Sequence, residues 1–195
     1  NWYIRRSTDN ALQTIRFGSV GDKPVAADFD GDTIADIAVY RPSTGVWYIL
    51  RSLDGQFIIR QFGISEDKTV AADYDGDGKS DVSVFRASEN NWYILRSSDF
   101  GVTQTAFAIA GDVPVPADFD GDGKTDVAIF RPSNGNWWSL SSINGQQINF
   151  PFGTAGDIPL PSDFDGDGRS DYVVFCPSTN QWLRASSANG AQSNK

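Results

Sequence analysis

The sequence predicts an all-β protein, organised as a β-propeller-like array of four-stranded antiparallel blades, and three observations predict this fold. Tryptophan and phenylalanine recur at a fixed spacing of 45 residues, at Trp2, Trp47, Trp92, Trp137 and Trp182 and at Phe17, Phe62, Phe107 and Phe152. Each unit holds four short runs rich in β-branched and aromatic residues, separated by Gly, Pro, Asn and Asp. No window places its apolar residues on one face of a helix. Four-stranded units repeated radially describe the blades of a propeller.

The first complete unit shows the expected order of strands. An apolar run leads into an acidic loop, a second run leaves it, and two further runs are joined by a turn at Asp54-Gly55. The four expected strands cover residues 24–28, 37–41, 46–51 and 56–62. Neighbouring side chains of a strand point to opposite sheet faces, so Trp47 and Tyr48 can each pack against a flanking blade. We interpret the recurring aromatic residues as inter-blade core, with sugar stacking by some of them as the alternative.

The same pattern indicates one repeat domain over residues 1–195. Residues 1–18 form a partial blade, because they match the third and fourth strands of a unit. Full blades are expected over residues 24–63, 69–108 and 114–153, and a blade lacking its fourth strand over 159–185. Three arrangements stay open: a ring closed by the N-terminal strand, a filament that grows through unpaired edges, and a piece of a longer propeller.

An acidic nine-residue loop occurs once in each unit, at residues 28–36, 73–81, 118–126 and 163–171. Each copy has aspartate at positions 1, 3, 5 and 9, and such a cluster is repulsive without a cation. Oxygen ligands at alternating positions around a glycine turn suit Ca²⁺. An ordinary Asp-Gly turn would explain one copy, but four copies in register favour a metal site. The first loop has Thr33 where the others have glycine, so we expect strain there and the weakest site if that position requires φ above zero.

Charge and composition limit the function further. The chain has 16 basic and 25 acidic residues and a net charge of −9, and four divalent ions would bring it close to neutral. No extended basic patch remains for nucleic acid, and no apolar run is long enough for membrane insertion. Weak calcium loops suit millimolar extracellular calcium. We therefore expect an extracellular or cell-surface protein.

The whole chain resembles the FG-GAP/VCBS-type repeats of integrin α-subunit propellers and bacterial surface proteins. The residues that carry the resemblance are Phe17-Gly18, Gly21–Pro24, the Asp-x-Asp-Gly-Asp loop and an Arg-Pro-Ser turn at Arg41 and Arg131. Ala108 and Glu66 depart from the family pattern, outside the loops. An EF-hand is excluded, because position 12 of the loop is Val or Ile and not the bidentate Glu of that motif.

The resemblance implies about four structural Ca²⁺ ions, each held between the first two strands of a blade. It implies four carboxylate ligands and one backbone carbonyl in each loop. The carboxylates are those of Asp28, Asp30, Asp32 and Asp36; Asp73, Asp75, Asp77 and Asp81; Asp118, Asp120, Asp122 and Asp126; and Asp163, Asp165, Asp167 and Asp171. The carbonyls are those of Ile34, Lys79, Lys124 and Arg169.

Three classes of function fit this pattern to different degrees. The leading hypothesis is a Ca²⁺-stabilised module for adhesion or scaffolding, with a protein or glycan surface as ligand and self-assembly into an oligomer or filament through incomplete terminal blades. A carbohydrate-binding lectin is the alternative, favoured by the aromatic surplus and by the polar turns at 88–91 and 133–136. We expect no enzyme, because the chain has no histidine and its spare acids, Asp22, Asp67, Asp112 and Asp157, repeat with the blades. A propeller hydrolase is the least favoured reading.

The single cysteine, Cys176, occupies the position that is Arg41, Arg86 or Arg131 in the other units. We interpret it as an inert substitution. An intermolecular disulfide is the alternative in a secreted protein.

Overall fold

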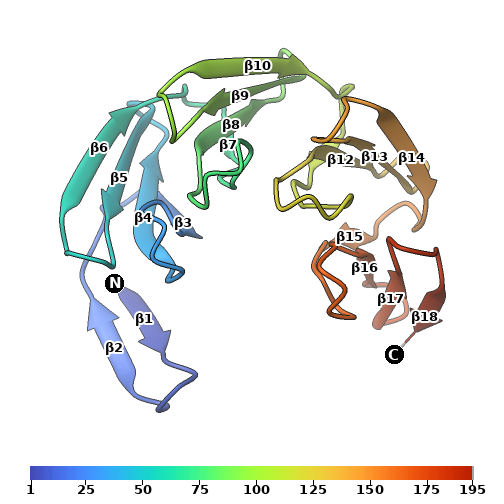
Figure 1. Cartoon of the computed structure of the whole chain (residues 1–195), viewed down its shortest axis with the longest axis horizontal. Helices are drawn as coiled ribbons and strands as arrows, with labels where there is room; N and C mark the ends of the chain where they lie inside the picture. Colours follow the sequence, from blue (N-terminus) through green and yellow to red (C-terminus); the bar gives the residue numbers. More distant parts are fainter. Residues whose placement is uncertain (195) are drawn as a thin grey trace.

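The four acidic loops each connect the first and second strands of a separate antiparallel sheet in a computed structural model, which describes residues 1–194. The sheets stand side by side along an open arc, with a two-stranded hairpin at its N-terminal end (Figure 1). The hairpin is β1 (Trp2–Arg5) and β2 (Leu12–Ile15). The predicted all-β propeller architecture is confirmed. No helix in the described residues is long and apolar enough to cross a bilayer.

Each blade is formed by four strands that are consecutive in the chain. The first blade holds β3 (Lys23–Ala27), β4 (Asp36–Arg41), β5 (Val46–Leu50) and β6 (Phe57–Gln61). The second holds β7 (Lys68–Thr69), β8 (Val82–Arg86), β9 (Asn91–Leu95) and β10 (Val102–Ala106). The third holds β11 (Val113–Pro114), β12 (Val127–Arg131), β13 (Asn136–Leu140) and β14 (Gln147–Pro151). The fourth holds β15 (Ile158–Pro159), β16 (Tyr172–Cys176), β17 (Gln181–Ala185) and β18 (Gln192–Asn194).

The strand register repeats with the sequence. The tryptophan of each third strand pairs with an aromatic residue of the second strand, as Tyr40↔Trp47, Phe85↔Trp92, Phe130↔Trp137 and Phe175↔Trp182. The first strands of the later blades are only two residues long, and an isolated bridge such as Ala72↔Asp81 continues the pairing beside the acidic loop. Because the register is the same in all four blades, each acidic loop has the same position relative to the strands of its blade.

The recurring tryptophans form much of the packing between blades. Trp47, Trp92 and Trp137 are almost completely buried, and each indole N–H donates to the carbonyl of Phe62, Phe107 or Phe152 at 2.8–3.1 Å. One apolar cluster joins Tyr40 and Trp47 of the first blade to Val82 and Val84 of the second. The interpretation as inter-blade core is confirmed for these three tryptophans. Trp182 of the last blade is instead 44% exposed.

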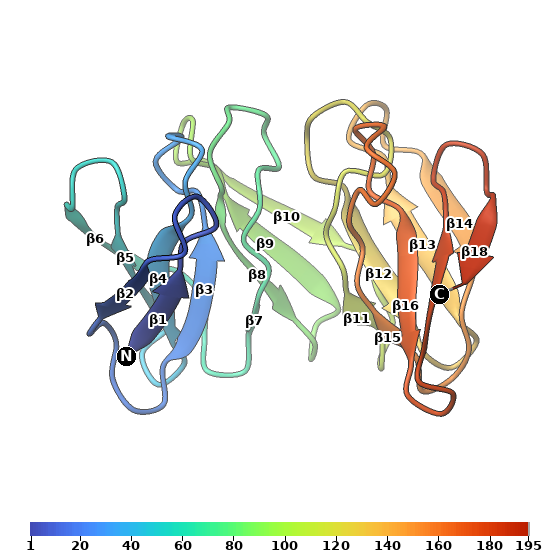
Figure 2. The ribbon, with the colours of Figure 1, turned by 90° about the horizontal axis from the view of Figure 1, so that it is seen from below.

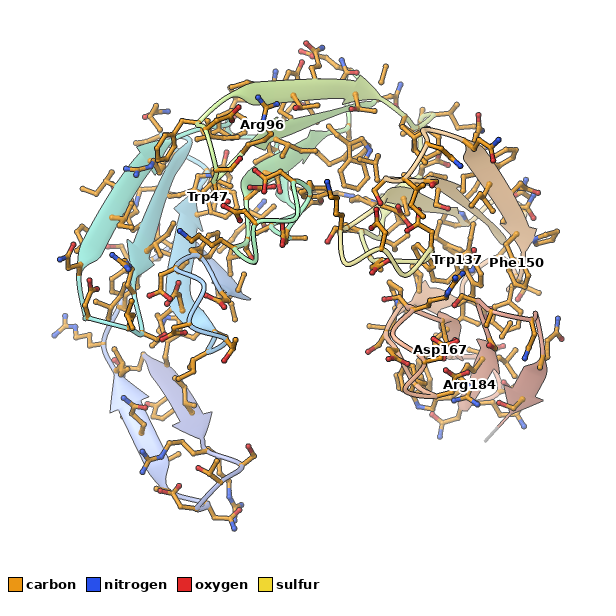
Figure 3. The ribbon with its side chains drawn as sticks, viewed as in Figure 1. Trp47, Arg96, Trp137, Phe150, Asp167 and Arg184 are labelled. Carbon is orange, nitrogen blue, oxygen red and sulfur yellow. The ribbon has the colours of Figure 1, made fainter. Side chains whose placement is uncertain are left out.

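The third and fourth blades are joined by stacked rings. Trp137 and Phe150, both labelled in Figure 3, pack against Tyr172 of the fourth blade with ring centroids 5.5 and 4.2 Å apart. Phe119 adds a further stacked contact with Tyr172 at 4.9 Å. An aromatic pair adds about 0.5–1.5 kcal/mol of stability beyond that from its buried area. These contacts therefore stabilise the junction between the third and fourth blades.

The prediction that the last blade lacks its fourth strand is wrong. Strand β18 pairs with β17 over three residues, and Gly190 N donates to Ser186 O at 2.8 Å in the connecting turn. Residues 190–194 have no large apolar side chain, so the alternating pattern gave no sign of a strand that backbone hydrogen bonds alone hold. The N-terminal strands pair with each other and not with this blade, and the two ends of the arc lie apart (Figure 1).

Candidate metal centre

The four acidic loops lie along one edge of the arc, next to the turns that join the third and fourth strands of each blade (Figure 2). Within each loop, carboxylate oxygens of three aspartates lie within 4.8 Å of one another. These groups are Asp28, Asp30 and Asp32; Asp73, Asp75 and Asp81; Asp118, Asp120 and Asp122; and Asp163, Asp165 and Asp171. Positions 1 and 3 converge in all four loops, position 5 in the first and third, and position 9 in the second and fourth.

The aspartate at position 1 holds the backbone turn together. Asp73 accepts hydrogen bonds from the amides of Gly76 and Gly78 at 2.6 and 2.9 Å. The equivalent amide hydrogen bonds lower the pKa of Asp163 below its usual range. A carboxylate that accepts several backbone N–H groups stays ionised, which is the state that a metal ligand needs.

Position 6 has a left-handed backbone in every loop. Its φ is +83° at Gly78, +86° at Gly123 and +88° at Gly168, and it is +70° at Thr33. A β-branched residue in this region is strained by about 1–2 kcal/mol. The condition on which strain at Thr33 depended, a positive φ at position 6, is therefore met. The lower affinity of the first loop stays a prediction.

The aspartate at position 9 is the buried member of each set. Asp81 accepts from the amide of Tyr74 at 3.0 Å and from that of Ser97 at 2.6 Å, and Asp126 has equivalent partners. Burial raises the pKa of Asp81 and of Asp126 to about 6. A buried carboxylate beside other carboxylates is costly to ionise unless a cation is close. The donor set, all hard oxygen atoms, therefore fits a divalent cation.

Serines from the turns between third and fourth strands support the loops, and the sequence reasoning missed them. The hydroxyl of Ser52 donates to Asp32 at 2.8 Å, and Ser97 and Ser142 donate to the matching aspartates at 2.9 Å. The signal was available, because serine recurs every 45 residues at Ser52, Ser97, Ser142 and Ser187. The hydroxyls of Ser52, Ser97 and Ser142 orient position 5 in the first three loops, and in the second loop position 5 lies outside the convergent group.

Adjacent loops are also linked to each other. The amide at position 8 of one loop donates to the carbonyl at position 1 of the loop before it, at 2.6–2.7 Å, in Ser80→Asp28, Thr125→Asp73 and Ser170→Asp118. The side chain at position 7 covers the glycine of the preceding loop, so a Cβ at Gly76 would lie only 2.7 Å from Lys124 Cε. The positive φ of Gly76, +81°, favours glycine at position 4. That the position-7 carbonyls bind an ion stays a prediction.

The spare acids of the repeat are engaged in ion pairs in three blades. Asp22, Asp67 and Asp112 are bound by Arg41, Arg86 and Arg131, with N–O distances of 2.8–2.9 Å. In the fourth blade the matching acid, Asp157, faces Cys176 instead. Burial, together with the neighbouring Asp157, raises the pKa of the Cys176 thiol to about 11. A thiol held protonated is a poor nucleophile, which agrees with the inert reading of this cysteine.

Comparison with known proteins identifies the repeat. The profile of the FG-GAP-like repeat matches residues 73–129 and, one unit later, residues 118–174, so the matches cover about half of the chain. The chain belongs to the FG-GAP-like repeat family. Both matched segments of this FG-GAP-like protein begin at position 1 of an acidic loop and end within the second strand of the next blade. No curated protein sequence matches the chain significantly.

Solved structures share the fold of this FG-GAP-like chain at low identity. The virginiamycin B lyase of Staphylococcus aureus, solved as an inactive variant with quinupristin, superposes over 97% of this chain with a TM-score of 0.63 and 10% identity. A streptogramin B lyase superposes over 96% of it with a TM-score of 0.63 and 12% identity. A lectin of Agrocybe aegerita that recognises non-reducing terminal N-acetylglucosamine superposes over 88%, with a TM-score of 0.57 and 19% identity. The chain spans 60%, 59% and 50% of these three chains, respectively.

Proposed function

We propose that this chain is a Ca²⁺-stabilised FG-GAP-like module that acts outside the cell in adhesion or as a scaffold. The observation that carries the proposal is the convergence of three carboxylates in each of four equivalent loops. The family membership and the oxygen-only donor set support it. The ligands are the aspartates at positions 1, 3, 5 and 9, with the position-7 carbonyls completing each site.

In this proposal the ion has a structural role. Each Ca²⁺ cancels the repulsion among its carboxylates and fixes the turn that joins two strands. The links between adjacent loops, such as Ser80 N to Asp28 O at 2.6 Å, extend that order along the edge of the arc. At a free concentration of 100 times its Kd, each bound ion stabilises the folded state by about 2.7 kcal/mol. The second, third and fourth loops, with glycine at position 6, are the strongest candidates.

Thermal unfolding tests this role. Metal-stripped protein should melt well below the Ca²⁺-loaded form, and Asp118→Asn should reduce the difference. Asp9→Asn, which changes an exposed aspartate outside the loops, is the matched control. A melting temperature that does not respond to Ca²⁺ would contradict the proposal.

Self-association is a further part of the proposal. The last blade exposes Phe164 and Trp182, which line one surface pocket, at 53% and 44%. Exposed aromatic side chains next to each other are a common feature of protein interfaces. Sedimentation of the Ca²⁺-loaded chain should show a concentration-dependent increase in size, which Trp182→Ser reduces. Sedimentation as a monomer at high concentration would contradict this part alone.

Carbohydrate binding is the second candidate function. It is favoured by aromatic rings that the inter-blade core does not use, above all Phe100, which is 63% exposed. A glycan array on the Ca²⁺-loaded chain tests it. An array without any bound glycan would remove this candidate and leave the structural role of calcium untouched.

A further inference from the structure

A small crevice lies between the first and second blades, next to the acidic loops. It has a volume of about 200 Å³, and its floor is apolar, formed by side chains that include Ile58 and Leu95. Four basic residues surround it: Arg51, Arg60, Lys79 and Arg96. Figure 3 labels Arg96 at this junction. The exposed ring of Phe100 closes one side.

The repeat supplies its own comparison, because the same crevice occurs again between the second and third blades. The second copy is lined by residues 45 positions later, and most of its lining is unchanged in character. It has Thr105 in place of Arg60 and Ser141 in place of Arg96, and Phe100 becomes Gly145, which does not line it. The packing of two blades therefore does not require the two arginines or the ring. Arg60 and the ring of Phe100 line the first crevice and not the second, whereas Arg96 lines both.

Phe100 has an unfavourable backbone conformation. Its φ is +57°, at the position where the other blades have Gly55, Gly145 and Gly190 with φ of +67° to +70°. A bulky side chain in the left-handed region is strained, and such strain clusters at functional sites. Burial does not compensate for it, because the ring is 63% exposed, and its close polar neighbour is the guanidinium of Arg60, 5.5 Å from the ring centroid.

Two of the four basic side chains of the crevice have no carboxylate partner, although the carboxylate of Asp30 also lines it. Arg51 is close to Asp30 and Asp54, at 3.3 and 3.2 Å, and Arg96 is paired with Asp99 at 3.0 Å. Arg60 and Lys79 have no carboxylate within 4 Å in residues 1–194. In a chain with a net charge of −9, two unpaired cations over one apolar hollow favour an anionic group.

We propose that this crevice binds one acidic sugar residue, a uronic acid or a sulfated sugar of an anionic glycan. The apolar face of the sugar ring would lie on Phe100, and its carboxylate or sulfate would be held by Arg60 and Lys79. The volume of about 200 Å³ is below the ~300–1,000 Å³ of pockets for drug-sized ligands, so it suits a single ring. The carboxylates of an acidic peptide could also pair with Arg60 and Lys79. Such a ligand would not explain why a strained, exposed aromatic residue, Phe100, lies beside them. This inference deepens the carbohydrate-binding candidate and rests on it, and the crevice borders the first and second acidic loops through Asp30 and Lys79.

Titration of the whole Ca²⁺-loaded chain with sodium D-glucuronate, followed by amide chemical shifts, tests the proposal. We expect saturable binding with shifts at Phe100 and Ser80, and at least tenfold weaker binding of D-glucose. Arg60→Thr installs the matching residue of the second blade, and Phe100→Gly installs the glycine of the other blades. Each should weaken glucuronate binding at least fivefold. Thr105→Ala, at the position of the second crevice that matches Arg60, is the matched control and should leave binding unchanged. The calcium-dependent melting temperature of each variant reports separately on the fold and on the proposed function of the loops.

Several results of the titration would overturn the proposal, and each would point to a different explanation. No saturable binding of glucuronate would overturn the proposal, and so would equal binding of glucose, because the cations would then have no role. Sulfate alone binding as tightly as glucuronate, without an effect of Phe100→Gly, would indicate a simple anion site. Acetyl-Glu-Asp binding more tightly than glucuronate would assign the crevice to acidic peptides. Glycans bound elsewhere would support the lectin candidate while overturning this site.

Discussion

Replacing Cys176 with arginine should restore an ion pair that the fourth blade lacks. In the third blade, Arg131 binds Asp112 through two hydrogen bonds of 2.9 Å, with the Arg131 side chain 19% exposed. In the fourth blade, Asp157 is buried and accepts hydrogen bonds from the amide and hydroxyl of Thr154 at 2.8 and 3.1 Å. Its carboxylate therefore has hydrogen-bond donors but lacks the arginine of the other blades.

The change in the free energy of unfolding depends on how buried the ion pair is and on which residue packs against the arginine. Removing one partner of a fully buried pair costs about 3–5 kcal/mol, and the partial exposure of Arg131 reduces this to about 1–3 kcal/mol for Arg131→Cys. The forward change, Cys176→Arg, should raise the free energy of unfolding by about 1–2 kcal/mol. The gain is smaller because Arg131 stacks on Trp138, 5.4 Å from its ring centroid, whereas the matching residue in the fourth blade is Leu183.

Urea unfolding in saturating Ca²⁺ measures both changes. The midpoint should rise for Cys176→Arg and fall for Arg131→Cys, with an unchanged m value. Cys176→Ala, which removes the thiol without adding charge, is the control. Asp157→Asn is a second test, in which no larger side chain has to fit. It should leave the free energy of unfolding unchanged or raise it, whereas Asp112→Asn should lower it. If Cys176→Arg and Asp157→Asn both destabilise, the unpaired-carboxylate account is wrong.

Three further outcomes are expected. Thr33→Gly should relieve about 1–2 kcal/mol of backbone strain and strengthen calcium binding by the first loop; equal affinities of all four loops in the parent protein would contradict this. Ser97→Ala should cost about 1 kcal/mol and weaken calcium binding, because Asp77 loses its 2.9 Å hydroxyl donor, and unchanged binding in a calorimetric titration would show that this serine has no role. The Arg41 hydrogen bond lowers the pKa of Asp22 below its ordinary value of 3.8, so this pair stabilises the fold above that pH and the contribution is lost as the pH falls through the lowered pKa. The stability difference between the parent protein and Asp22→Asn should therefore shrink on acidification, and a difference that grows would refute the sign.

The repeat allowed much of the fold to be predicted from the sequence. The 45-residue spacing placed the blades, the loops between first and second strands, and the buried tryptophans Trp47, Trp92 and Trp137. The positive φ at Thr33 entered the sequence analysis only as a condition for strain, and the structure meets it. These features depend on interactions within one unit or between identical units, and periodicity alone carries that information.

The features that were missed depend on contacts that a single unit does not encode. Strand β18 is held by backbone hydrogen bonds and has no apolar pattern. Serine is common in turns, so Ser52 and its equivalents did not stand out until the turn was seen beside the loop. The crevice at Phe100 requires two blades side by side. The departure of the second blade at Phe100, where the other blades have glycine, was the informative signal.

The central claim is that bound calcium holds together the acidic loops along one edge of the arc. Equilibrium dialysis of the metal-stripped chain against ⁴⁵Ca²⁺ at millimolar concentration tests it most directly. We predict four bound calcium ions per chain, one for each loop. This number should fall to three when the position-1 aspartate Asp118 is replaced by asparagine. Retention of no calcium, or of the same amount after Asp118→Asn, would contradict the account.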